Sequence, residues 1–170
     1  MTSFLDKLFG LEGRVAAITG GGGYLCGEMA RGLARAGCKI AVMDLRGHKA
    51  EDVAKDITDT IGVEAIGLEI DASDKTSFAL GLDQTVAAFG RADILINGAG
   101  INAPTPFLDI TIDEFNDVIE SQITSTLLGC QIFGRHMLDQ GKGAIINISS
   151  ASAGPPLSKA FSYSIAKAGI

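Results

Sequence analysis

The chain has 170 residues, of which 46% are hydrophobic and only four are proline, so its composition excludes a disordered chain and allows a sizeable core. Its 14 basic and 20 acidic residues give a net charge of −6 without a basic cluster, which argues against nucleic acid or an anionic membrane as a partner. No apolar run approaches the length that spans a membrane, and the first residues lack the layout of a signal peptide.

Short apolar runs alternate with longer helical patterns along the chain. The apolar runs predict strands at residues 15–18, 40–43, 64–70, 94–96 and 145–148. The helical patterns predict helices at residues 25–36, 49–61, 75–89 and 112–138, with another beginning near residue 160. Gly37 and Gly90 stand where glycines commonly end helices. The alternation predicts an α/β fold of the Rossmann type, a doubly wound parallel sheet in three αβα layers with strand order 3-2-1-4-5, formed by residues 1–170 as one domain.

The cysteines and histidines indicate no metal site and no thiol chemistry. Cys26, Cys38 and Cys130 are odd in number and lack the spacing of metal ligands. They are typical of small buried residues in a reducing compartment, so we expect a cytoplasmic protein. His48 and His136 are isolated in the sequence, and we expect them to be solvated rather than catalytic.

The first predicted strand runs into a glycine-rich turn, Thr19-Gly20-Gly21-Gly22-Gly23-Tyr24-Leu25-Cys26-Gly27. Glycines in such a turn let backbone N–H groups approach a pyrophosphate at the N-terminus of the next helix, where the helix dipole favours negative charge. A glycine-rich turn alone is a weak signal, but the strand before it and the helix after it are the context of a dinucleotide site. The turn therefore predicts cofactor contacts at Gly20, Gly22, Gly23 and Leu25.

Asp44 ends the second predicted strand. A carboxylate at this place accepts hydrogen bonds from the ribose hydroxyls of adenosine and repels a 2′-phosphate, which predicts NAD rather than NADP as the cofactor. Leu45 and Gly23 stand where phosphate-binding basic residues are usual, although Arg46 leaves NADP open. The alternative for Asp44 is a surface carboxylate that starts a helix.

The last quarter of the chain carries the candidate catalytic residues. An apolar run that ends at Ser150 predicts a buried strand with hydroxyl groups at its carboxyl end. Pro155 and Pro156 are expected to stop regular structure, and a helix follows them. Tyr163 and Lys167 lie one helical turn apart, so they share a face of that helix.

This arrangement can perform acid–base chemistry. A free tyrosine hydroxyl has a pKa near ~10 and is a poor base at neutral pH. One ammonium group about 4 Å away in a partly shielded site supplies on the order of 4 kcal/mol, which corresponds to a shift of about three pKa units. Lys167 can thereby tune Tyr163 into a general acid or base, while Ser150 holds the substrate oxygen. The pair alone is weak evidence, since an exposed Tyr–Lys pair on a helix is the ordinary alternative.

The order and spacing of Ser150, Tyr163 and Lys167 resemble the catalytic residues of the short-chain dehydrogenase/reductase family, in its common branch. The resemblance extends over nearly the whole chain, and it implies hydride transfer between a nicotinamide cofactor and a secondary alcohol or carbonyl compound. It also implies that Tyr163 exchanges the hydroxyl proton and that Lys167 binds the nicotinamide ribose. A homo-oligomer, a dimer or tetramer with contacts along the long helix after Thr111, is implied as well.

Two further motifs carry the resemblance. Asp71-Ala72 matches a pair that contacts adenine in the family, although Asp71 by itself predicts a helix cap. Asn97-Gly98-Ala99-Gly100 resembles the family's Asn-Asn-Ala-Gly, and its first, third and fourth residues are expected beside the cofactor. Small residues there let the cofactor lie across the strand ends, and Asn97 is able to tie neighbouring strands together.

Several residues depart from the family's patterns. Tyr24 and Cys26 stand at the second and third glycines of the family's Thr-Gly-x-x-x-Gly-x-Gly turn. The neighbouring glycines would restore the close approach through a shifted turn; the alternative is that the cofactor site has been lost. Gly98 replaces an asparagine. Gln122 aligns with the asparagine that holds a water in the family's proton relay, and we expect Gln122 in that relay although its amide lies one carbon further out.

The substrate class is the least specified part of the prediction. The serine-rich run before the proline loop is most similar to relatives that act on sugars, polyols or sugar acids. Two alternatives remain: an epimerase or dehydratase of the family's extended branch, and a non-catalytic relative that binds nucleotide and acts by association. In the family two more strands and a substrate-covering loop follow. Because the strand at residues 144–149 would otherwise leave an apolar edge unpaired, we expect the natural chain to continue past Ile170, or a partner to cover that edge.

Overall fold

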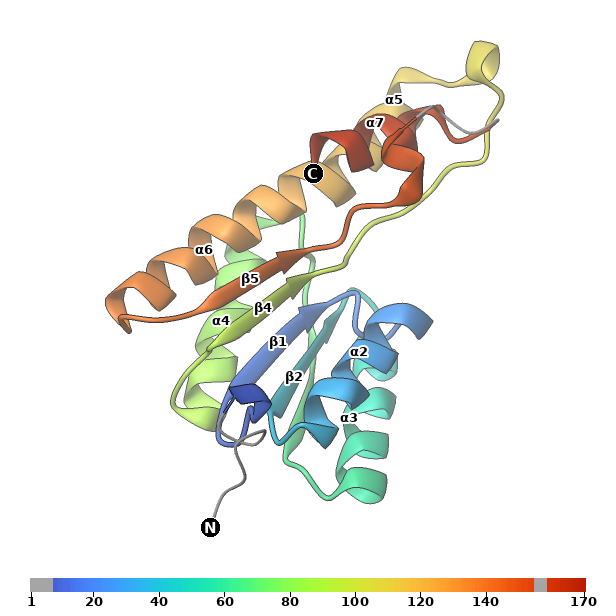
Figure 1. Ribbon diagram of the computed structural model, residues 1–170. Helices are drawn as coiled ribbons and strands as arrows, with labels where there is room; N and C mark the ends of the chain where they lie inside the picture. Colours follow the sequence, from blue (N-terminus) through green and yellow to red (C-terminus); the bar gives the residue numbers. More distant parts are fainter. Residues whose placement is uncertain (1–7, 155–158) are drawn as a thin grey trace.

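A five-stranded parallel sheet forms the centre of the protein, described by a computed structural model for residues 8–154 and 159–170 (Figure 1). The strands are β1 (Val15–Thr19), β2 (Lys39–Asp44), β3 (Ala65–Glu69), β4 (Ile94–Asn97) and β5 (Ala144–Asn147). Their order is β3-β2-β1-β4-β5, and all four pairings are parallel. This confirms the predicted Rossmann-type sheet and its strand order. The expected break at Pro155 and Pro156 lies outside the described residues.

Helices cover both faces of this sheet. On one face lie α2 (Tyr24–Arg35) and α3 (Gly47–Ile61), and on the other α4 (Lys75–Phe89) and α6 (Ser125–Asp139) (Figure 1). Successive residues of a strand point to opposite faces, so Ala16 and Ile18 of β1 pack toward α2 and α3 while Ala17 packs toward the other pair. Two apolar cores result, one on each face, as three αβα layers require.

The helix ends follow the predicted turn chemistry with one correction. Gly37 and Gly90 adopt positive φ angles of 96° and 79° at the ends of α2 and α4, as the sequence predicted. The prediction that Asp71 caps a helix is wrong, because the N-cap of α4 is Asp74, whose side chain accepts a hydrogen bond from the backbone N–H of Ser77. Asp71 instead accepts hydrogen bonds from the backbone and hydroxyl of Ser73 and shapes the turn before the helix.

The single helix predicted at residues 112–138 is interrupted. It consists of α5 (Ile112–Ile119), a π-helical turn η2 (Glu120–Thr124) and α6. The hydroxyls of Ser125 and Thr126 donate to backbone carbonyls of the π turn, which competes with regular helical bonding. Such turns widen a helix by one residue and re-aim the side chains that follow.

The end of the described chain is less enclosed than the sequence predicted. Strand β5 is the edge of the sheet, and Ile146 is 48% exposed, so the expectation of a buried strand is wrong for this part. After β5 come the short turn η3 (Ala151–Ala153) and α7 (Phe161–Gly169), which packs against α5. A further short turn, η1 (Phe107–Asp109), precedes α5, and its Phe107 ring meets Phe161 edge to face. Among the helices of residues 8–154 and 159–170, none has both the length and the apolar character to span a membrane.

Candidate cofactor and catalytic site

A cavity of about 460 Å³ opens at the carboxyl ends of the strands. Five segments line it: the glycine-rich turn, the end of β2, the segment from β3 to α4, the segment after β4, and the π turn η2. Its lining residues are Gly20, Gly23, Asp44, Leu45, Arg46, Ile70, Asp71, Ala72, Ser73, Ala99, Gly100, Ile101 and Ser121. Seven of the predicted cofactor residues are among them, which places the predicted site where parallel α/β sheets bind ligands.

The glycine-rich turn is packed too tightly for side chains. Gly20 has a φ of 68°, and a Cβ on it would come within 3.0 Å of the carbonyl oxygen of Gly98. A Cβ on Gly22 would lie 3.0 Å from Asp44 Oδ2. Gly23 is the N-cap of α2 and supplies no side-chain hydrogen bond to the first turn of that helix. The helix N-terminus therefore keeps backbone donors that fit an anionic group such as a pyrophosphate.

Asp44 is a buried carboxylate with an exposure of 5%, so the alternative of a surface carboxylate is wrong. Its Oδ2 accepts a hydrogen bond from the backbone N–H of Gly22 at 3.1 Å. Its Oδ1 accepts two hydrogen bonds from Arg46, from the backbone N–H at 3.0 Å and from Nε at 3.2 Å. Asp44 thus joins the glycine-rich turn to the start of α3, while the Arg46 side chain remains half exposed at the cavity.

Thr19 organises the end of β4, although no sequence motif assigned it this role. Its Oγ1 accepts hydrogen bonds from the backbone N–H groups of Gly98 and Ala99 and donates to the carbonyl of Ile96. In the sequence, this role was indicated only by the position of Thr19 at the end of a strand, directly before the glycines. Asn97 lies behind the cavity wall, where its Nδ2 donates to Asn147 Oδ1 at 2.9 Å and so ties β4 to β5.

Tyr163 and Lys167 meet on α7, as the spacing predicted. The Lys167 Nζ lies 5.5 Å from the centroid of the Tyr163 ring and donates a hydrogen bond to the carbonyl of Ile148 at 2.7 Å. The Ser149 hydroxyl donates to the carbonyl of Lys167, also at 2.7 Å, so α7 is fastened twice to the segment after β5. Burial lowers the pKa of the Lys167 ammonium, and the nearby Cys26 thiol acts in the opposite direction.

Ser150 follows this fastened segment directly. Its Oγ accepts a hydrogen bond from the backbone N–H of Ser152 at 3.1 Å and caps the short turn η3. Ser150, Tyr163 and Lys167 therefore come from two segments that Lys167 itself holds together. Their catalytic roles remain predictions.

Three other predicted residues have different surroundings. Gln122 is fully buried in the π turn, and its Nε2 donates to the carbonyl of Ile101 at 2.9 Å. Within the described residues no hydrogen bond joins Gln122 to Lys167 or Tyr163, and its Oε1 is buried without a partner. Gly22 uses its N–H for Asp44, and Leu25 is exposed on the first turn of α2.

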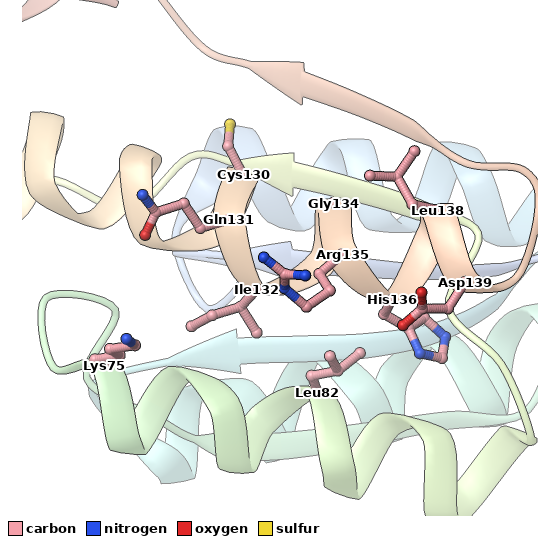
Figure 2. Close-up of a pocket in the computed structure, with 10 residues that line it drawn as sticks. All are labelled: Lys75, Leu82, Cys130, Gln131, Ile132, Gly134, Arg135, His136, Leu138 and Asp139. Atoms are coloured by element: carbon pink, nitrogen blue, oxygen red, sulfur yellow. The ribbon is translucent and has the colours of Figure 1, made fainter.

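A larger cavity of about 810 Å³ lies between α4 and α6, away from these residues (Figure 2). Lys75, Leu82, Arg135 and Leu138 are among the side chains around it, and it contains no predicted catalytic or cofactor residue. His136, expected in solvent, is partly buried there with its Nε2 unpartnered. In the described part of the chain no group of His, Cys, Asp or Glu side chains is arranged to hold a metal ion.

Comparison with known proteins decides the family. The family model described as short chain dehydrogenase matches residues 14–170. The chain belongs to the short-chain dehydrogenase family. The matched range includes the glycine-rich turn, Asp44 and the helix that carries Tyr163 and Lys167.

Individual relatives in this family are similar over most of the chain. The uncharacterized oxidoreductase UxuB of Bacillus subtilis is 38% identical over 94% of this chain and 63% of its own length. D-threitol dehydrogenase of Mycolicibacterium smegmatis is 32% identical over 98% of this chain and 64% of its own length. The solved structure of NAD+-bound xylitol dehydrogenase superposes with a TM-score of 0.89 at 28% identity, over 93% of this chain and 61% of that one. The chain thus spans less than two thirds of the length of these relatives.

Proposed function

We propose that this protein is an NAD(H)-dependent dehydrogenase that interconverts a secondary alcohol and a carbonyl compound of the polyol, sugar or sugar-acid class. The observation that carries the proposal is the buried Asp44 at a glycine-lined cavity, on the same edge of the sheet as Lys167 and Tyr163. The cavity at Asp44 and the Tyr163–Lys167 pair lie at the same sheet, so we propose that residues 1–170 form one domain.

The cavity fits a nicotinamide dinucleotide. The first turn of α2, which no side chain of the described residues caps, leaves backbone donors for the pyrophosphate, and Gly20 and Gly23 line the cavity without side chains that would fill it. Asp44 offers carboxylate oxygens to the ribose hydroxyls of adenosine, and Leu45, Ile70 and Ala72 provide apolar walls for adenine. Ala99 and Gly100 line the wall that follows β4.

The chain's own residues then perform the proton chemistry. When bound, the cofactor supplies the nicotinamide ring that accepts or donates the hydride. In oxidation the Tyr163 phenolate oxygen takes the proton from the substrate hydroxyl, and in reduction the Tyr163 hydroxyl donates that proton to the substrate oxygen, while Ser150 Oγ holds the substrate oxygen. The Lys167 ammonium lies beside the Tyr163 ring and contacts the nicotinamide ribose. We propose that Gln122 positions the cavity wall, since it donates a hydrogen bond to the carbonyl of Ile101 and makes none to Lys167.

The names of similar proteins support the proposed substrate class. Two similar proteins are a D-threitol dehydrogenase and a xylitol dehydrogenase, and threitol and xylitol are both polyols. Because the chain spans only part of these relatives, the activity belongs to the whole protein, which we propose to be a cytoplasmic homo-oligomer. NAD is preferred over NADP because Asp44 opposes a 2′-phosphate.

A panel assay tests the proposal. The full-length protein is supplied with NAD or NADP and a series of tetritols, pentitols, hexitols and simple secondary alcohols, and the absorbance of the reduced cofactor is followed. We expect turnover of at least one polyol with NAD. Binding of NADH without turnover of any substrate would favour the non-catalytic relative, and conversion of a sugar without net change in cofactor would favour the epimerase or dehydratase.

A further inference from the structure

Cys26 and Gly98 occupy one space between helix α2 and the end of β4. Cys26 lies in the first turn of α2 and is buried. A Cβ built on Gly98 would overlap the Sγ of Cys26, and it would also come within 3.1 Å of the carbonyl oxygen of Thr19. The cysteine side chain is therefore accommodated only because residue 98 has no side chain.

The two residues connect opposite walls of the cofactor cavity. Cys26 stands at the N-terminus of the helix that begins at the glycine-rich turn. Gly98 donates its N–H to Thr19 Oγ1 at 3.1 Å and directly precedes Ala99 and Gly100, which line the cavity. A change in the contact between Cys26 and Gly98 would therefore move the helix N-terminus relative to this wall.

We propose that Cys26 and Gly98 form a matched pair that positions the two walls of the cavity for the cofactor, with the thiol filling the space that glycine leaves. The inference rests on the proposed function, since it takes NAD(H) as the ligand of the cavity. It names Cys26 as a positioning residue and gives it no role in the chemistry.

The surroundings of the thiol agree with packing rather than reactivity. Cys26 belongs to the apolar core beside Ile18 and Ile96. Burial raises the pKa of this thiol, Lys167 acts to lower it, and Asp44 adds to the increase. A neutral buried thiol is a poor nucleophile and behaves as a small apolar side chain.

A double-mutant cycle in the full-length protein tests the pair, using Gly98→Ala, Cys26→Ala and the double variant. The dissociation constant of NADH is measured by fluorescence titration well below the Tm of every variant, and Tm is measured in parallel. We expect Gly98→Ala to weaken NADH binding about tenfold or more, because the added methyl group overlaps Cys26 Sγ and pushes the two cavity walls apart. We expect Cys26→Ala to change it less than about threefold and the double variant to return within about threefold of the parent.

Gly32→Ala is the matched control, because it adds the same atom to α2 in open space. It should leave NADH binding unchanged. If Gly98→Ala proves insoluble, a double variant that folds and binds NADH like the parent still supports the pair, whereas a double variant that fails as well overturns it.

The remaining outcomes separate this inference from the proposed function. Normal NADH binding by Gly98→Ala, or a double variant as weak as Gly98→Ala, overturns the pairing. If the double variant recovers the Tm of the parent but not its affinity for NADH, the two residues pack together without positioning the cavity walls, and the proposal is overturned. If the parent protein binds neither NADH nor NADPH, the proposed function is overturned. This outcome is distinguishable from failure of the pair, because binding is then absent without any substitution.

Discussion

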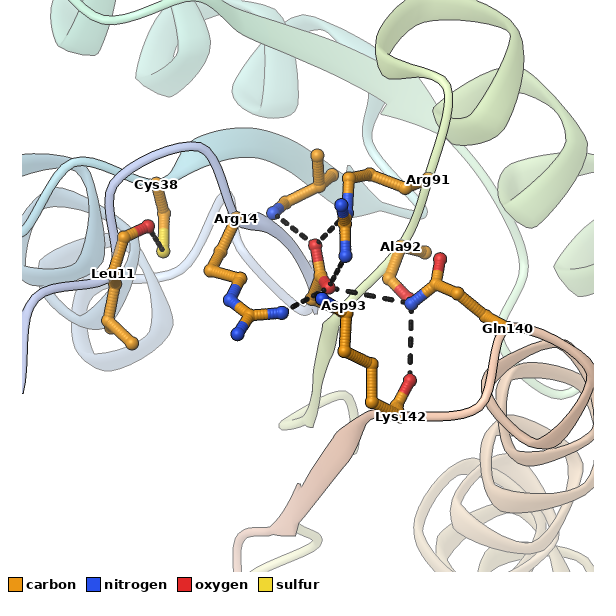
Figure 3. A network of polar contacts seen from close by, with 9 residues as sticks. Leu11, Arg14, Cys38, Arg91, Ala92, Asp93, Gln140 and Lys142 are labelled. Atoms are coloured by element: carbon orange, nitrogen blue, oxygen red, sulfur yellow. Dashed lines mark hydrogen bonds and ion pairs between the residues drawn. The ribbon is translucent and has the colours of Figure 1, made fainter.

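The two ends of the sheet differ in how completely their buried polar groups are hydrogen-bonded. At the amino end, Asp93 is 3% exposed, and both of its oxygens are used (Figure 3). Oδ1 accepts hydrogen bonds from Arg14 Nη1 at 3.0 Å and from Arg91 Nη2, and Oδ2 accepts them from the backbone N–H of Val15 at 3.0 Å and from Arg91 Nε at 2.6 Å. Gln140 adds a longer contact of 3.4 Å from the end of α6.

At the carboxyl end, Asp44 is also bonded on both oxygens, but two other buried side chains keep an oxygen without a protein partner in the part of the chain that the structure describes. Asn97 Oδ1 and Gln122 Oε1 are buried with no hydrogen bond in the described residues, and the N-terminus of α2 has no side-chain cap. Buried polar groups are ordinarily satisfied, so such exceptions mark a ligand, a bound water or a functional site. The amino end thus uses its charges to hold β1, β4 and α6 together, whereas the carboxyl end, as far as it is described, keeps an uncapped helix N-terminus beside the cavity and two unpaired side-chain oxygens.

Among substitutions that distinguish the two ends of the sheet, Tyr163→Phe is expected to have the largest effect, and that effect is on turnover. Turnover should fall about 10²- to 10⁴-fold, because the hydroxyl that exchanges the proton is lost. The dissociation constant of NADH and the Tm should stay close to those of the parent, since the ring remains beside Lys167. Steady-state kinetics, fluorescence titration and thermal unfolding measure the three quantities. Turnover equal to the parent's would contradict the proposed mechanism.

Asp93→Asn should have the reverse pattern. The free energy of unfolding should fall by about 2 kcal/mol, because charge-assisted hydrogen bonds are lost while the shape of the side chain is kept. We expect less than the full cost of breaking a buried ion pair, since Arg14 and Arg91 are partly exposed and can be hydrated. Denaturant unfolding measures the loss, and NADH affinity should remain within about twofold of the parent's; a clear loss of affinity would show that the two ends are coupled.

The pH dependence of stability gives the same prediction a second readout. Burial alone would raise the pKa of Asp93, but hydrogen bonds from Arg91, from the backbone of Val15 and from Arg14 outweigh it and lower the pKa below the usual value. The stabilisation is therefore fully present above about pH 4, the range of an unfolded aspartate, and is lost as the pH falls through the lower folded-state pKa. The difference between parent and Asp93→Asn should accordingly shrink in acid, and a constant difference would contradict this account.

The smallest effects are expected at the cofactor end from Asp44→Ala and Arg46→Ala. Asp44→Ala should reduce the preference for NAD over NADP by about tenfold, because the repulsion of a 2′-phosphate is removed. Arg46→Ala should increase that preference by about twofold to fivefold, because the half-exposed guanidinium no longer compensates the charge of Asp44. The ratio of kcat/KM for the two cofactors, or of their dissociation constants, measures both.

The two substitutions act as controls for each other. A preference unchanged in Asp44→Ala would show that another residue discriminates between the cofactors. A preference that moves in the same direction in both variants would show that Arg46 and Asp44 do not oppose each other at this site.

The sequence alone was sufficient for the sheet and for most of the cavity lining. The spacing of apolar residues and the glycines at helix ends are local patterns that predict alternating strands and helices. This alternation is typical of a Rossmann-type sheet, whose strand order places Asp44 and the glycine-rich turn on one edge. The Tyr163–Lys167 contact was also predictable, because residues four apart on a helix share a face.

Other features needed the tertiary structure. Val15 and Asp93 are 78 residues apart, and no local pattern indicates that they bond. The same holds for Thr19 with Gly98, for Gln122 with Ile101, and for the exclusion of a side chain at Gly98 by Cys26. The sequence determined the strands and most of the helices along the chain, because those preferences are local, although it did not indicate the π turn between α5 and α6. Only the folded chain decided which side chains meet across the sheet and which buried groups stay unpaired, because that depends on packing between distant segments.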